Sequence, residues 1–559
     1  MSKLLKEKAI NLFNKQDFQN SLNILIDLSK KEPKSIDVLM YIAFNLMQLH
    51  KYNDAVSYLK NIITLNKNLP QIFYNLAICF GILGKYKEAI DSYKKAISIK
   101  KDYFEAYIQL GQLLKKINLL DDAIAVYKTA LTQDIQTDSI YVNISELYYL
   151  KKNYQLSMTL ANEALNLNPK NYLAMINIAN CLMEKGEVAN AIIELEKAKN
   201  ICPNSPMIFN NLGFFYKQLE NDEKATENYI KAIELNPELH DAHFNLSHIQ
   251  LSQNNFKEGW HNYEYRWSVQ KKFSLKLNFN KPQWNENLGF DRILIWGEQG
   301  IGEQILFSSI LPDIISKFKK VLICVEDKLV KLFQKKFVDL EVCSLSNKIN
   351  ENEFDYHLPI CSLAKVFRNH PDHFNQINYK YLQDDNNPKR NNKKLRCALS
   401  WKSTNKDLAN YKSIQLEDLK EILFLDDIDF FDIQYTNEEK EVSAIKKKHN
   451  IDIYKDQTFD SFDDLYELSE FIKTCDFVIT VSNTNAHISA FMGVPTYILL
   501  PKTRGKFWYW ENDINGQNLW YPSIVKFKQE KQNEWLTPIN NLKNYLIQSY
   551  YSNSNNKAI

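Results

Sequence analysis

Apolar side chains recur every three or four positions through residues 2–273, in short blocks separated by polar turns. This spacing puts the apolar positions on one face of a helix, so each block predicts an amphipathic helix. The blocks also resemble one another. The stretch "PQIFYNLAICFGILGKYKEAIDSYKKAISI" begins at Pro70, and "PMIFNNLGFFYKQLENDEKATENYIKAIELNP" begins at Pro206. Their offset of 136 residues is four periods of 34, so the pattern predicts a repeated pair of helices.

A period of 34 residues with this pattern is typical of tetratricopeptide repeats. Eight frames fit without insertion, starting at residues 2, 36, 70, 104, 138, 172, 206 and 240. Position 20 of the frame is always small, as expected where two helices cross closely. It is occupied by Ser21, Ala55, Ala89, Ala123, Ser157, Ala191, Ala225 and Gly259. We therefore expect a helical superhelix with a concave face suited to binding peptides.

Position 6 of the frame carries a column of amide side chains. It consists of Asn75, Asn143, Asn177, Asn211 and Asn245, with Gln109 between the first two. An amide both donates and accepts hydrogen bonds, so such a column is able to hold a peptide backbone without reading its sequence. The alternative is that these amides bond within the array.

The pattern changes after residue 290 to short apolar runs that alternate with helical segments, which predicts parallel sheets. The expected strands are 292–296, 320–326, 340–345 and 355–360, then 396–401, 429–435, 476–481 and 495–500. A polar run at 383–394 reads as a linker between two lobes. The predicted domains are repeats at 2–273, a linker at 274–290, a Rossmann-like acceptor-side lobe at 291–385, a Rossmann-like donor-side lobe at 393–548, and a disordered tail at 549–559.

Composition narrows the classes of partner. A net charge of +2 gives no support for general binding to nucleic acids or anionic membranes. No apolar stretch approaches the roughly 20 residues that span a bilayer. The N-terminus lacks the apolar core of a signal peptide. The eight cysteines are scattered, so we expect buried free thiols, a reducing compartment and a cytoplasmic protein.

Candidate anion-binding residues follow the ends of the predicted strands in the second lobe. Ser482, Asn483, Thr484 and Asn485 lead into a short helix, and His487 would lie in its first turn. A helix N-terminus offers free N–H groups and a partial positive charge, which suit a diphosphate. The alternative is a capped helix with an incidental histidine.

Two other residues lie at strand ends of the same lobe. Lys402 is a second candidate anion contact, unless it is merely a solvated lysine, and Gln434 is expected near a nucleotide. Two Rossmann-like lobes suit a nucleotide-linked substrate gripped from both sides.

Several motifs together resemble bacterial tetratricopeptide–glycosyltransferase fusions. They are "WGEQGIGEQILFSSILPDI", "DYHLPICSLAKVF", "LSWKSTN", "VSNTNAHISAFMGVPTYILLP" and "FWYW…LWYPSIVKF". The catalytic half of those fusions is related to heptosyltransferases and has the two-lobed B-type glycosyltransferase (GT-B) fold. The amide column resembles the asparagine column of the O-linked N-acetylglucosamine transferase, which holds protein substrates.

This resemblance implies an inverting, metal-independent glycosyltransferase. A nucleotide sugar would be the co-substrate, with no other cofactor. The acceptor would be a protein or peptide, such as flagellin or another surface protein, held by the repeats. In the family the glycine turn reads G-x-G-D, and the aspartate of heptosyltransferases is the catalytic base. Here Glu303 stands in its place, one methylene longer. Glu298 is the fallback base, and the alternative for Glu303 is a carboxylate that stabilises the first turn of its helix.

Other interpretations stay open. The substitution of glutamate for aspartate favours a runner-up, a protein-interaction scaffold whose glycosyltransferase domain is degenerate. The glycine spacing is wrong for the dinucleotide fingerprint of an oxidoreductase, although Glu326 would suit a ribose. The "DID" at 427–429 imitates a metal motif but leads straight into a strand. His240, His243 and His248 tempt a metal interpretation, but packing and surface roles explain them better.

Overall fold

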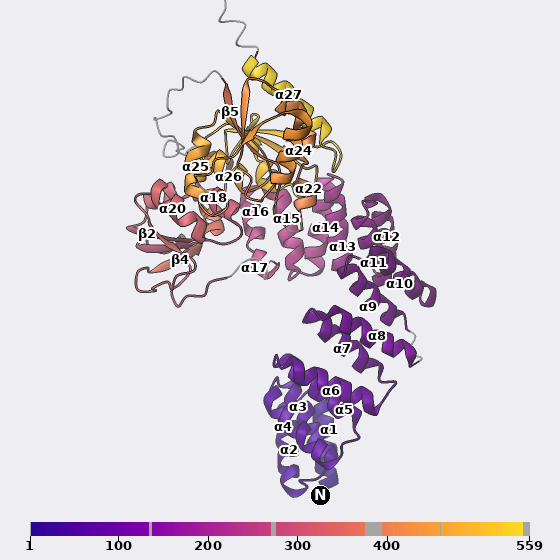
Figure 1. Cartoon of the computed structure of the whole chain (residues 1–559). Coiled ribbons are helices and arrows are strands. Elements are labelled where there is room, and N and C mark those ends of the chain that lie inside the picture. The colour runs from indigo at the N-terminus through magenta and orange to yellow at the C-terminus, as the bar shows by residue number, and fades with distance from the viewer. Residues whose placement is uncertain are drawn as a thin grey trace, which may run out of the picture. The chain divides into compact units, whose positions relative to one another are not determined.

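The computed structural model describes residues 2–133, 137–269, 276–374, 394–405, 407–458 and 460–551. The chain divides into two compact units, residues 1–204 and 205–559. Figure 1 labels helices and strands of both units. The predicted linker at 383–394 and tail at 549–559 lie largely outside the described residues.

The first unit consists of antiparallel helix pairs that follow the 34-residue frame. Its helices are α1 Ser2–Asn14, α2 Phe18–Lys31, α3 Ile36–Gln48, α4 Tyr52–Leu65, α5 Pro70–Ile82, α6 Tyr86–Ile99, α7 Phe104–Lys116, α8 Leu120–Thr132, α9 Asp138–Leu150, α10 Tyr154–Leu167, α11 Tyr172–Glu184 and α12 Val188–Ile201. The first helix of each pair starts at frame position 1 and the second at position 17. The helical repeat predicted from the sequence is therefore confirmed.

The second unit begins with two more helix pairs and continues into the lobes. The pairs are α13 Pro206–Gln218 with α14 Asp222–Leu235, and α15 His240–Ser252 with α16 Phe256–Tyr263, followed by α17 Arg266–Val269. The small residues at frame position 20 are buried in all eight repeats, which confirms the predicted helix crossings.

One backbone feature of the repeats was not predicted. Frame position 15 has a positive φ in every repeat and ends the first helix in the left-handed conformation. The residues are Gln16, His50, Gly84, Asn118, Lys152, Gly186, Glu220 and Asn254. Only two are glycines, so most repeats adopt this turn with a side chain that disfavours it.

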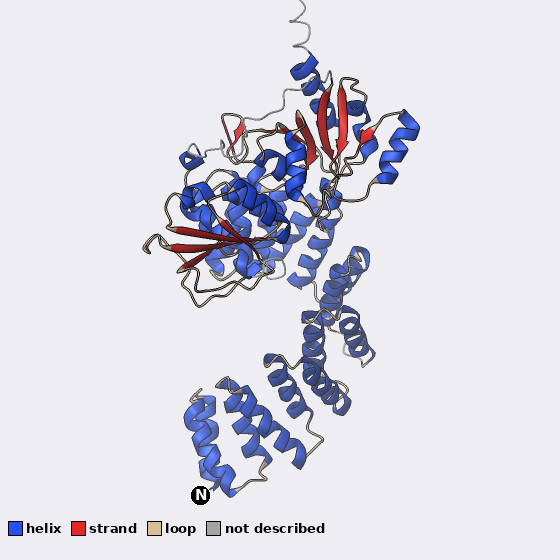
Figure 2. Ribbon diagram, turned by 60° about the vertical axis from the view of Figure 1, so that its left-hand side comes forward, coloured by secondary structure: helices blue, strands red, loops and turns tan. Residues whose placement is uncertain are grey.

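The first lobe contains a four-stranded sheet in which all strands are parallel (Figure 2). Its strands are β1 Arg292–Trp296, β2 Lys320–Val325, β3 Glu341–Ser344 and β4 Tyr356–Pro359, in the order β3-β2-β1-β4. Its helices are α18 Ile301–Ser308, α19 Leu311–Ile315, α20 Asp327–Lys336 and α21 Leu363–Phe367, with short 3-10 turns η1 Ile360–Ser362 and η2 Pro371–Phe374. The single helix expected after β1 is broken near Pro312, which lies in the first turn of α19.

The second lobe contains a six-stranded parallel sheet in the order β12-β9-β8-β5-β6-β7. Its strands are β5 Leu395–Ser400, β6 Ile428–Asp432, β7 Ile453–Tyr454, β8 Phe477–Val481, β9 Thr496–Leu500 and β12 Ile524–Lys528, beside a small hairpin of β10 Asp513–Ile514 and β11 Gln517–Asn518. Its helical segments are α22 Ala409–Lys412, η4 Leu416–Leu419, α23 Lys420–Leu423, α24 Glu439–His449, α25 Leu465–Lys473, α26 Thr484–Phe491, η5 Trp508–Trp510, α27 Leu536–Leu546 and η6 Ile547–Tyr551. All eight predicted strands are present, whereas β7, β12 and the hairpin were not predicted.

The last repeat shares one hydrophobic core with both lobes. The buried indole of Trp260 in α16 packs edge-on against Phe307 of α18, at a centroid distance of 5.9 Å, and against Trp508 at 5.3 Å. Its Nε1 donates a hydrogen bond to the Arg368 carbonyl oxygen at 2.8 Å. The aromatic end of the repeats is therefore packed into the core of the lobes.

A buried ion pair joins α17 to the turn after β1. The Arg266 guanidinium donates to both carboxylate oxygens of Glu298, from Nε at 2.9 Å and Nη2 at 2.6 Å, and both side chains are fully buried. Arg266 also contacts Glu264 at 2.8 Å and the Ser362 hydroxyl at 2.8 Å. Such a bidentate pair has a defined geometry, so it fixes the start of the glycine turn relative to the last repeat.

We expect Glu298→Leu to destabilise the second unit by about 3 kcal/mol, because it leaves the Arg266 charge buried with only Glu264 as a partner. All nine tryptophans lie in the second unit, so the urea midpoint of tryptophan fluorescence reports its unfolding. The matched control is Asp291→Leu, which removes the exposed pair with Lys319 and should leave the midpoint nearly unchanged. Equal midpoints for the two variants would show that the buried pair does not support this unit.

Candidate active site between the two parallel sheets

The strand orders identify where each lobe can bind a ligand. In the second sheet the chain runs β5, β6, β7 to one side and then β8, β9, β12 to the other, so the order reverses between β5 and β8. In the first sheet it reverses between β1 and β4. Ligands of open parallel sheets bind outside the carboxyl ends of the strands at such reversal points. The loops after β1, β5 and β8 are therefore the candidate site.

The glycine turn after β1 allows close contacts on both of its sides. A Cβ at Gly302 would lie 2.7 Å from Cδ2 of His487, so the absence of a side chain lets α18 pack against α26 of the other lobe. A Cβ at Gly297 would lie 2.4 Å from Oε1 of Gln304, the atom that accepts a hydrogen bond from the Glu326 amide at 3.1 Å. The turn thus ties β1 to β2 and brings the two lobes together.

A cleft of about 270 Å³ lies where these loops meet. It is lined by Gly300, Ile301, Gly302 and Glu303 from the glycine turn, by Ser403, Thr404, Asn405, Lys412 and Tyr435, by Ser482, Asn483, Thr484 and His487, and by Phe507 and Tyr509. The predicted base and most of the predicted anion loop therefore face one cavity.

Several groups of the cleft favour the charged form of Glu303. They are the backbone N–H groups of Glu303 itself and of Gly300, the Lys412 ammonium and the Tyr509 hydroxyl. Burial raises the pKa of Glu303 above its usual range, although these N–H groups, the Lys412 charge and Tyr509 act against that rise. A carboxylate with a raised pKa is a stronger proton acceptor than an exposed one.

Lys412, which the sequence interpretation missed, is the cation of the cleft. Its side chain is 3% exposed, and burial lowers its pKa to about 8 while the Glu303 carboxylate opposes that change. The lysine lies at the end of α22 in the run "NYKSI", where no motif singled it out. At neutral pH it is protonated, so it provides a positive charge in a water-poor site.

His487 faces the cleft as a neutral side chain. Burial, and then the Lys412 charge, lower its pKa to about 3. Its Nδ1 lies 3.0 Å from the Tyr521 hydroxyl, and its ring packs at 4.8 Å from that of Trp510. The predicted contribution of His487 to donor binding would then come from a neutral imidazole.

The side chains of the loop after β8 mainly hold the loop itself. Asn483 caps α26 by accepting from the Ala486 amide at 3.2 Å, and it donates to the Lys402 carbonyl oxygen at 3.0 Å. Ser482 accepts from Trp510 Nε1 at 2.9 Å, and Asn485 donates to the Ile433 carbonyl oxygen at 2.8 Å. Thr484 is half-buried at the cleft. The loop is thus rigidly presented at the N-terminus of α26.

The side chains of Lys402 and Gln434 make other contacts than the sequence analysis predicts. The Lys402 ammonium forms ion pairs with Glu438 and Glu441 of α24, and its side chain is not among those that line the cleft. Its charge is neutralised there, and the cleft lysine is Lys412 instead. The side-chain Oε1 of Gln434 accepts hydrogen bonds from the backbone amides of Trp401 and Lys402, both at 3.0 Å, so it joins the ends of β5 and β6.

A second cavity of about 650 Å³ adjoins the cleft, and Tyr435 lines both. Its lining includes Gln434 and Tyr435 together with Asp456, Ser461 and Phe462. Through Tyr435, the second cavity lies next to the cleft.

The fallback base does not reach the cleft. Glu298 is committed to the buried pair with Arg266, with both carboxylate oxygens accepting hydrogen bonds, and it does not line the cavity. The structure therefore leaves Glu303 as the carboxylate of the site among the residues it describes there.

The amide column of the repeats is half-buried throughout. Asn177 donates to the Val142 carbonyl oxygen at 3.2 Å, Asn143 donates to that of Ser139 at 2.7 Å, and Asn245 donates to Asn210 at 3.3 Å. These bonds use the amide N–H groups, so part of the column's hydrogen-bonding capacity serves the array itself.

The cysteine prediction is wrong for one pair. Cys324 of β2 and Cys343 of β3 lie directly opposite each other and form a disulfide, which removes the argument from free thiols for a reducing compartment.

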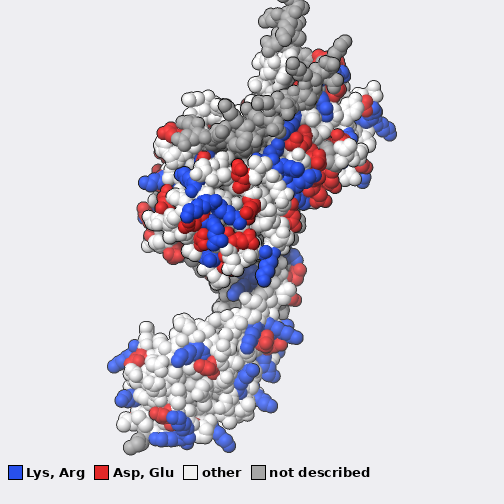
Figure 3. Space-filling model, turned by 90° about the vertical axis from the view of Figure 1, so that its left-hand side faces the viewer, with Lys and Arg blue, Asp and Glu red and all other residues white. Residues whose placement is uncertain are grey.

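Within the described ranges, no group of three potential ligands could hold a metal ion, and no helix is both long and apolar enough to cross a membrane. On the face drawn in Figure 3, basic and acidic side chains are interspersed over the described surface, in line with the balanced net charge.

Comparisons with known proteins identify the repeats. A tetratricopeptide-repeat family model matches residues 104–134, 138–171, 172–205 and 208–239, and a second TPR model matches 82–118. The chain is 24% identical to Protein FlbA of Caulobacter vibrioides over 401 residues, 66% of each chain.

Solved structures of repeat proteins are also similar. A tetratricopeptide repeat protein from Parabacteroides merdae has 17% identity and a TM-score of 0.38, covering 44% of this chain and 97% of that one. YrrB, described as a TPR protein with an unusual peptide-binding site, has 22% identity and a TM-score of 0.26, covering 33% and 95%. The family models identify tetratricopeptide repeats in the N-terminal region, a scaffold suited to protein interaction.

The pKa of Lys412 predicts how anion binding depends on pH. Inorganic pyrophosphate should bind below pH 8, where Lys412 is protonated, and its affinity should fall about tenfold per pH unit above pH 8. In Lys412→Arg the charge persists, so the affinity should stay level over the same range. Both affinities are measured by isothermal titration calorimetry. The ionisation of pyrophosphate itself is the same in both titrations, so it cancels when the two proteins are compared. Parallel pH profiles for the two proteins would exclude Lys412 from the anion site.

Proposed function

We propose that the protein is a glycosyltransferase that moves a sugar from a nucleotide-sugar donor to a protein acceptor held by the repeats. The observation that carries this proposal is the meeting of the glycine turn of one lobe with the α26 loop of the other. Their contact encloses a carboxylate, Glu303, and a buried lysine, Lys412, in one cleft. We propose that this cleft between two lobes with parallel sheets corresponds to that of a GT-B enzyme.

The chemistry requires a base on one side of the sugar and a cation on the other. Glu303 would remove the proton of an acceptor hydroxyl as its oxygen bonds to the anomeric carbon of the sugar. The bond from that carbon to the diphosphate oxygen then breaks, and the nucleoside diphosphate leaves with the electron pair. Lys412 and the N-terminal amides of α26 would stabilise the negative charge on the leaving group. Attack opposite the leaving group inverts the anomeric centre.

The adjoining cavity supports a place for the nucleoside. It opens beside Tyr435 and Phe462, whose rings lie 6.5 Å apart, and it is large enough to extend a ligand beyond the cleft. We infer that the diphosphate lies in the cleft and the base and ribose lie toward the end of β6. Gln434 would then support the nucleotide through the loops that it joins.

One observation favours a second function, a protein-interaction scaffold without transfer activity. The expected base is a glutamate, whereas the family that the sequence resembles has an aspartate there, and the Tyr509 hydroxyl already favours the charged form of this carboxylate. In that case the repeats alone would carry the function. The cytoplasm remains the expected compartment under both proposals.

The decisive variant is Glu303→Gln, which keeps the size of the side chain but cannot accept a proton. We expect kcat to fall by roughly 10²–10⁴, the usual contribution of a general base. Wild-type activity should follow a bell-shaped pH profile. It should rise as Glu303 loses its proton above its raised pKa, and fall above about pH 8 as Lys412 loses its own. Turnover is measured as nucleotide release in the presence of acceptor.

The companion variant is Glu303→Asp, which restores the residue of the resembling family. Donor affinity, measured by calorimetry, should stay unchanged in both variants, because the second lobe provides most of the donor contacts. Normal turnover in Glu303→Gln would make Glu303 structural. An inactive wild type with an active Glu303→Asp would establish the scaffold instead.

The amide column generates a separate expectation. Replacing Asn143 and Asn177 with alanine should raise the KM for a protein acceptor several-fold and leave kcat and donor affinity unchanged, because each change removes a side-chain carbonyl oxygen that would accept from a peptide N–H. The exposed pair Asn162→Ala and Asn166→Ala on α10 is the matched control. A KM that moves equally in both double variants would refute the peptide-holding role.

A further inference from the structure

A second pocket of the second unit lies where repeats seven and eight meet the loop after β9. We call it the seam pocket. It is lined by Phe214, Lys217, Gln218, Glu220, Tyr229, Asn245, His248, Ser252, Thr503, Lys506, Phe507, Trp508 and Glu511, and its volume is about 170 Å³. Five or six molecules occupy roughly this volume in liquid water, so the pocket has room for one large side chain.

The seam pocket connects the amide column to the cleft. Asn245, the last member of the column, lines it on one side, and Phe507 lines both this pocket and the cleft on the other. The seam pocket thus shares one lining residue with the amide column and one with the cleft.

The walls of the pocket offer aromatic surface without free charge. Phe214, Tyr229, Phe507 and Trp508 provide rings. His248 is neutral, because burial and then the Lys217 charge lower its pKa to about 4. These features disfavour a charged occupant and favour an aromatic one.

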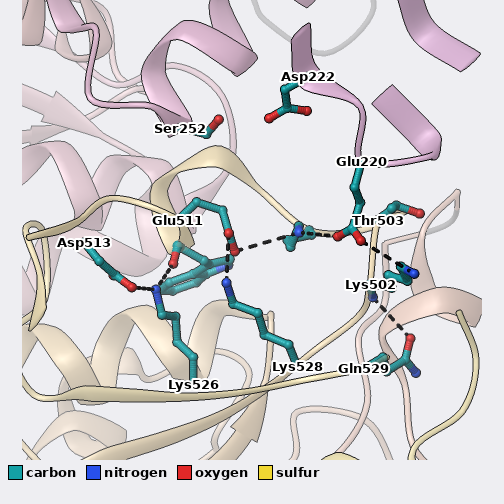
Figure 4. A network of polar contacts seen from close by, with 12 residues as sticks. Glu220, Asp222, Ser252, Lys502, Thr503, Glu511, Asp513, Lys526, Lys528 and Gln529 are labelled. Atoms are coloured by element: carbon teal, nitrogen blue, oxygen red, sulfur yellow. Dashed lines mark hydrogen bonds and ion pairs between the residues drawn. The ribbon is translucent and has the colours of Figure 1, made fainter. Parts of the chain in front are cut away.

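The charged side chains of the lining form ion pairs with one another or with neighbouring residues outside the lining. Lys217 contacts Asp222 at 2.8 Å, and Lys506 contacts Glu220 at 3.4 Å and Glu511 at 3.9 Å. Glu511 also forms an ion pair with Lys528 at 2.8 Å (Figure 4).

One acceptor in the lining lacks a hydrogen-bond donor. Oε1 of Glu511 is buried and receives no hydrogen bond from the residues that the structure describes, since the Lys506 ammonium is too distant for one. Lys506 and then Lys528 hold the pKa of Glu511 below its ordinary value against the opposing effect of burial, so the group is a carboxylate. A buried carboxylate oxygen without a donor is costly, and an O–H from a ligand would satisfy it.

We propose that the seam pocket binds a tyrosine side chain of the acceptor protein, close in sequence to the residue that is modified. The ring would pack among the aromatic walls, and its hydroxyl would donate to Glu511. This inference rests on the proposed function, because only a glycosyltransferase has an acceptor protein. The binding of a tyrosine side chain to the pocket can nevertheless be measured without any transfer reaction. It makes the seam pocket a specificity determinant of the same site.

The test uses fluorescein-labelled peptides of equal length, built from glycine, serine and threonine with one guest residue. Fluorescence anisotropy with the full chain should show saturable binding of the tyrosine peptide. It should be about tenfold weaker with phenylalanine, which lacks the hydrogen bond to the carboxylate, and absent with lysine or glutamate. Equal binding of the four peptides, or no binding of the tyrosine peptide, overturns the proposal.

Two variants locate the binding. Ser252→Phe fills the pocket, because the Ser252 hydroxyl makes only a local hydrogen bond to the Ile249 carbonyl oxygen, and it should reduce tyrosine-peptide binding at least tenfold. Phe214→Ala removes a partly exposed wall without threatening the fold and should weaken binding several-fold. Leu150→Phe, at the same frame position as Ser252 in another repeat, is the control and should bind as the wild type does. Unchanged binding in Ser252→Phe and Phe214→Ala refutes the assignment.

Donor binding separates this inference from the proposed function. Pyrophosphate affinity should be the same in Ser252→Phe and the wild type, because Ser252 does not line the cleft. If the tyrosine peptide binds as expected but no transfer is ever detected, the proposed function fails and the pocket stands as a peptide site. If transfer occurs and its acceptor KM is the same in Ser252→Phe, the pocket has no part in acceptor choice.

Discussion

The burial of Trp260 is the contact on which the second unit depends. Its indole ring is enclosed by Phe307 from the first lobe and by Trp508 and Trp520 from the second, and its one N–H group is satisfied by the Arg368 carbonyl oxygen. A side chain that three segments enclose cannot be withdrawn from one without opening the others. The last repeat is therefore part of the core of the lobes rather than an appended module.

That shared core also positions residues of the cleft. Phe507 and Tyr509 flank Trp508, so the same short segment packs on the repeat with one side chain and lines the cleft with its neighbours. Within the cleft, burial shifts the two ionisable groups toward each other: the pKa of Glu303 rises and that of Lys412 falls to about 8. Two ionisable groups in one cavity whose pKa values are shifted in opposite directions are typical of sites that transfer protons near neutral pH.

Periodic features of the chain could be predicted from the sequence, and single contacts could not. The 34-residue frame located the helix starts in all eight repeats, because the interhelix crossings require a small residue at a fixed position. Eight of the ten strands in the two parallel sheets were also visible as short apolar runs, whereas β7 and β12 were not. By contrast, the choice between Lys402 and Lys412 depends on whether Glu438 and Glu441 lie beside the lysine, which is set by the packing of α24. The pairing of Cys324 with Cys343 depends in the same way on the register of β2 and β3.

The glutamate at position 303 shows how local contacts can offset a change in side-chain length. The additional methylene gives the carboxylate one more rotatable bond than an aspartate has, so an unsupported glutamate would spread over several rotamers. Here the N–H groups of Glu303 and Gly300, from the glycine turn, and the Tyr509 hydroxyl, from the other lobe, favour the charged form of the carboxylate and oppose the effect of burial on its pKa. A carboxylate placed among these groups is favoured over one that points elsewhere. Because Tyr509 is positioned by the packing of its neighbour Trp508 on Trp260, the orientation of Glu303 depends on the docking of the last repeat.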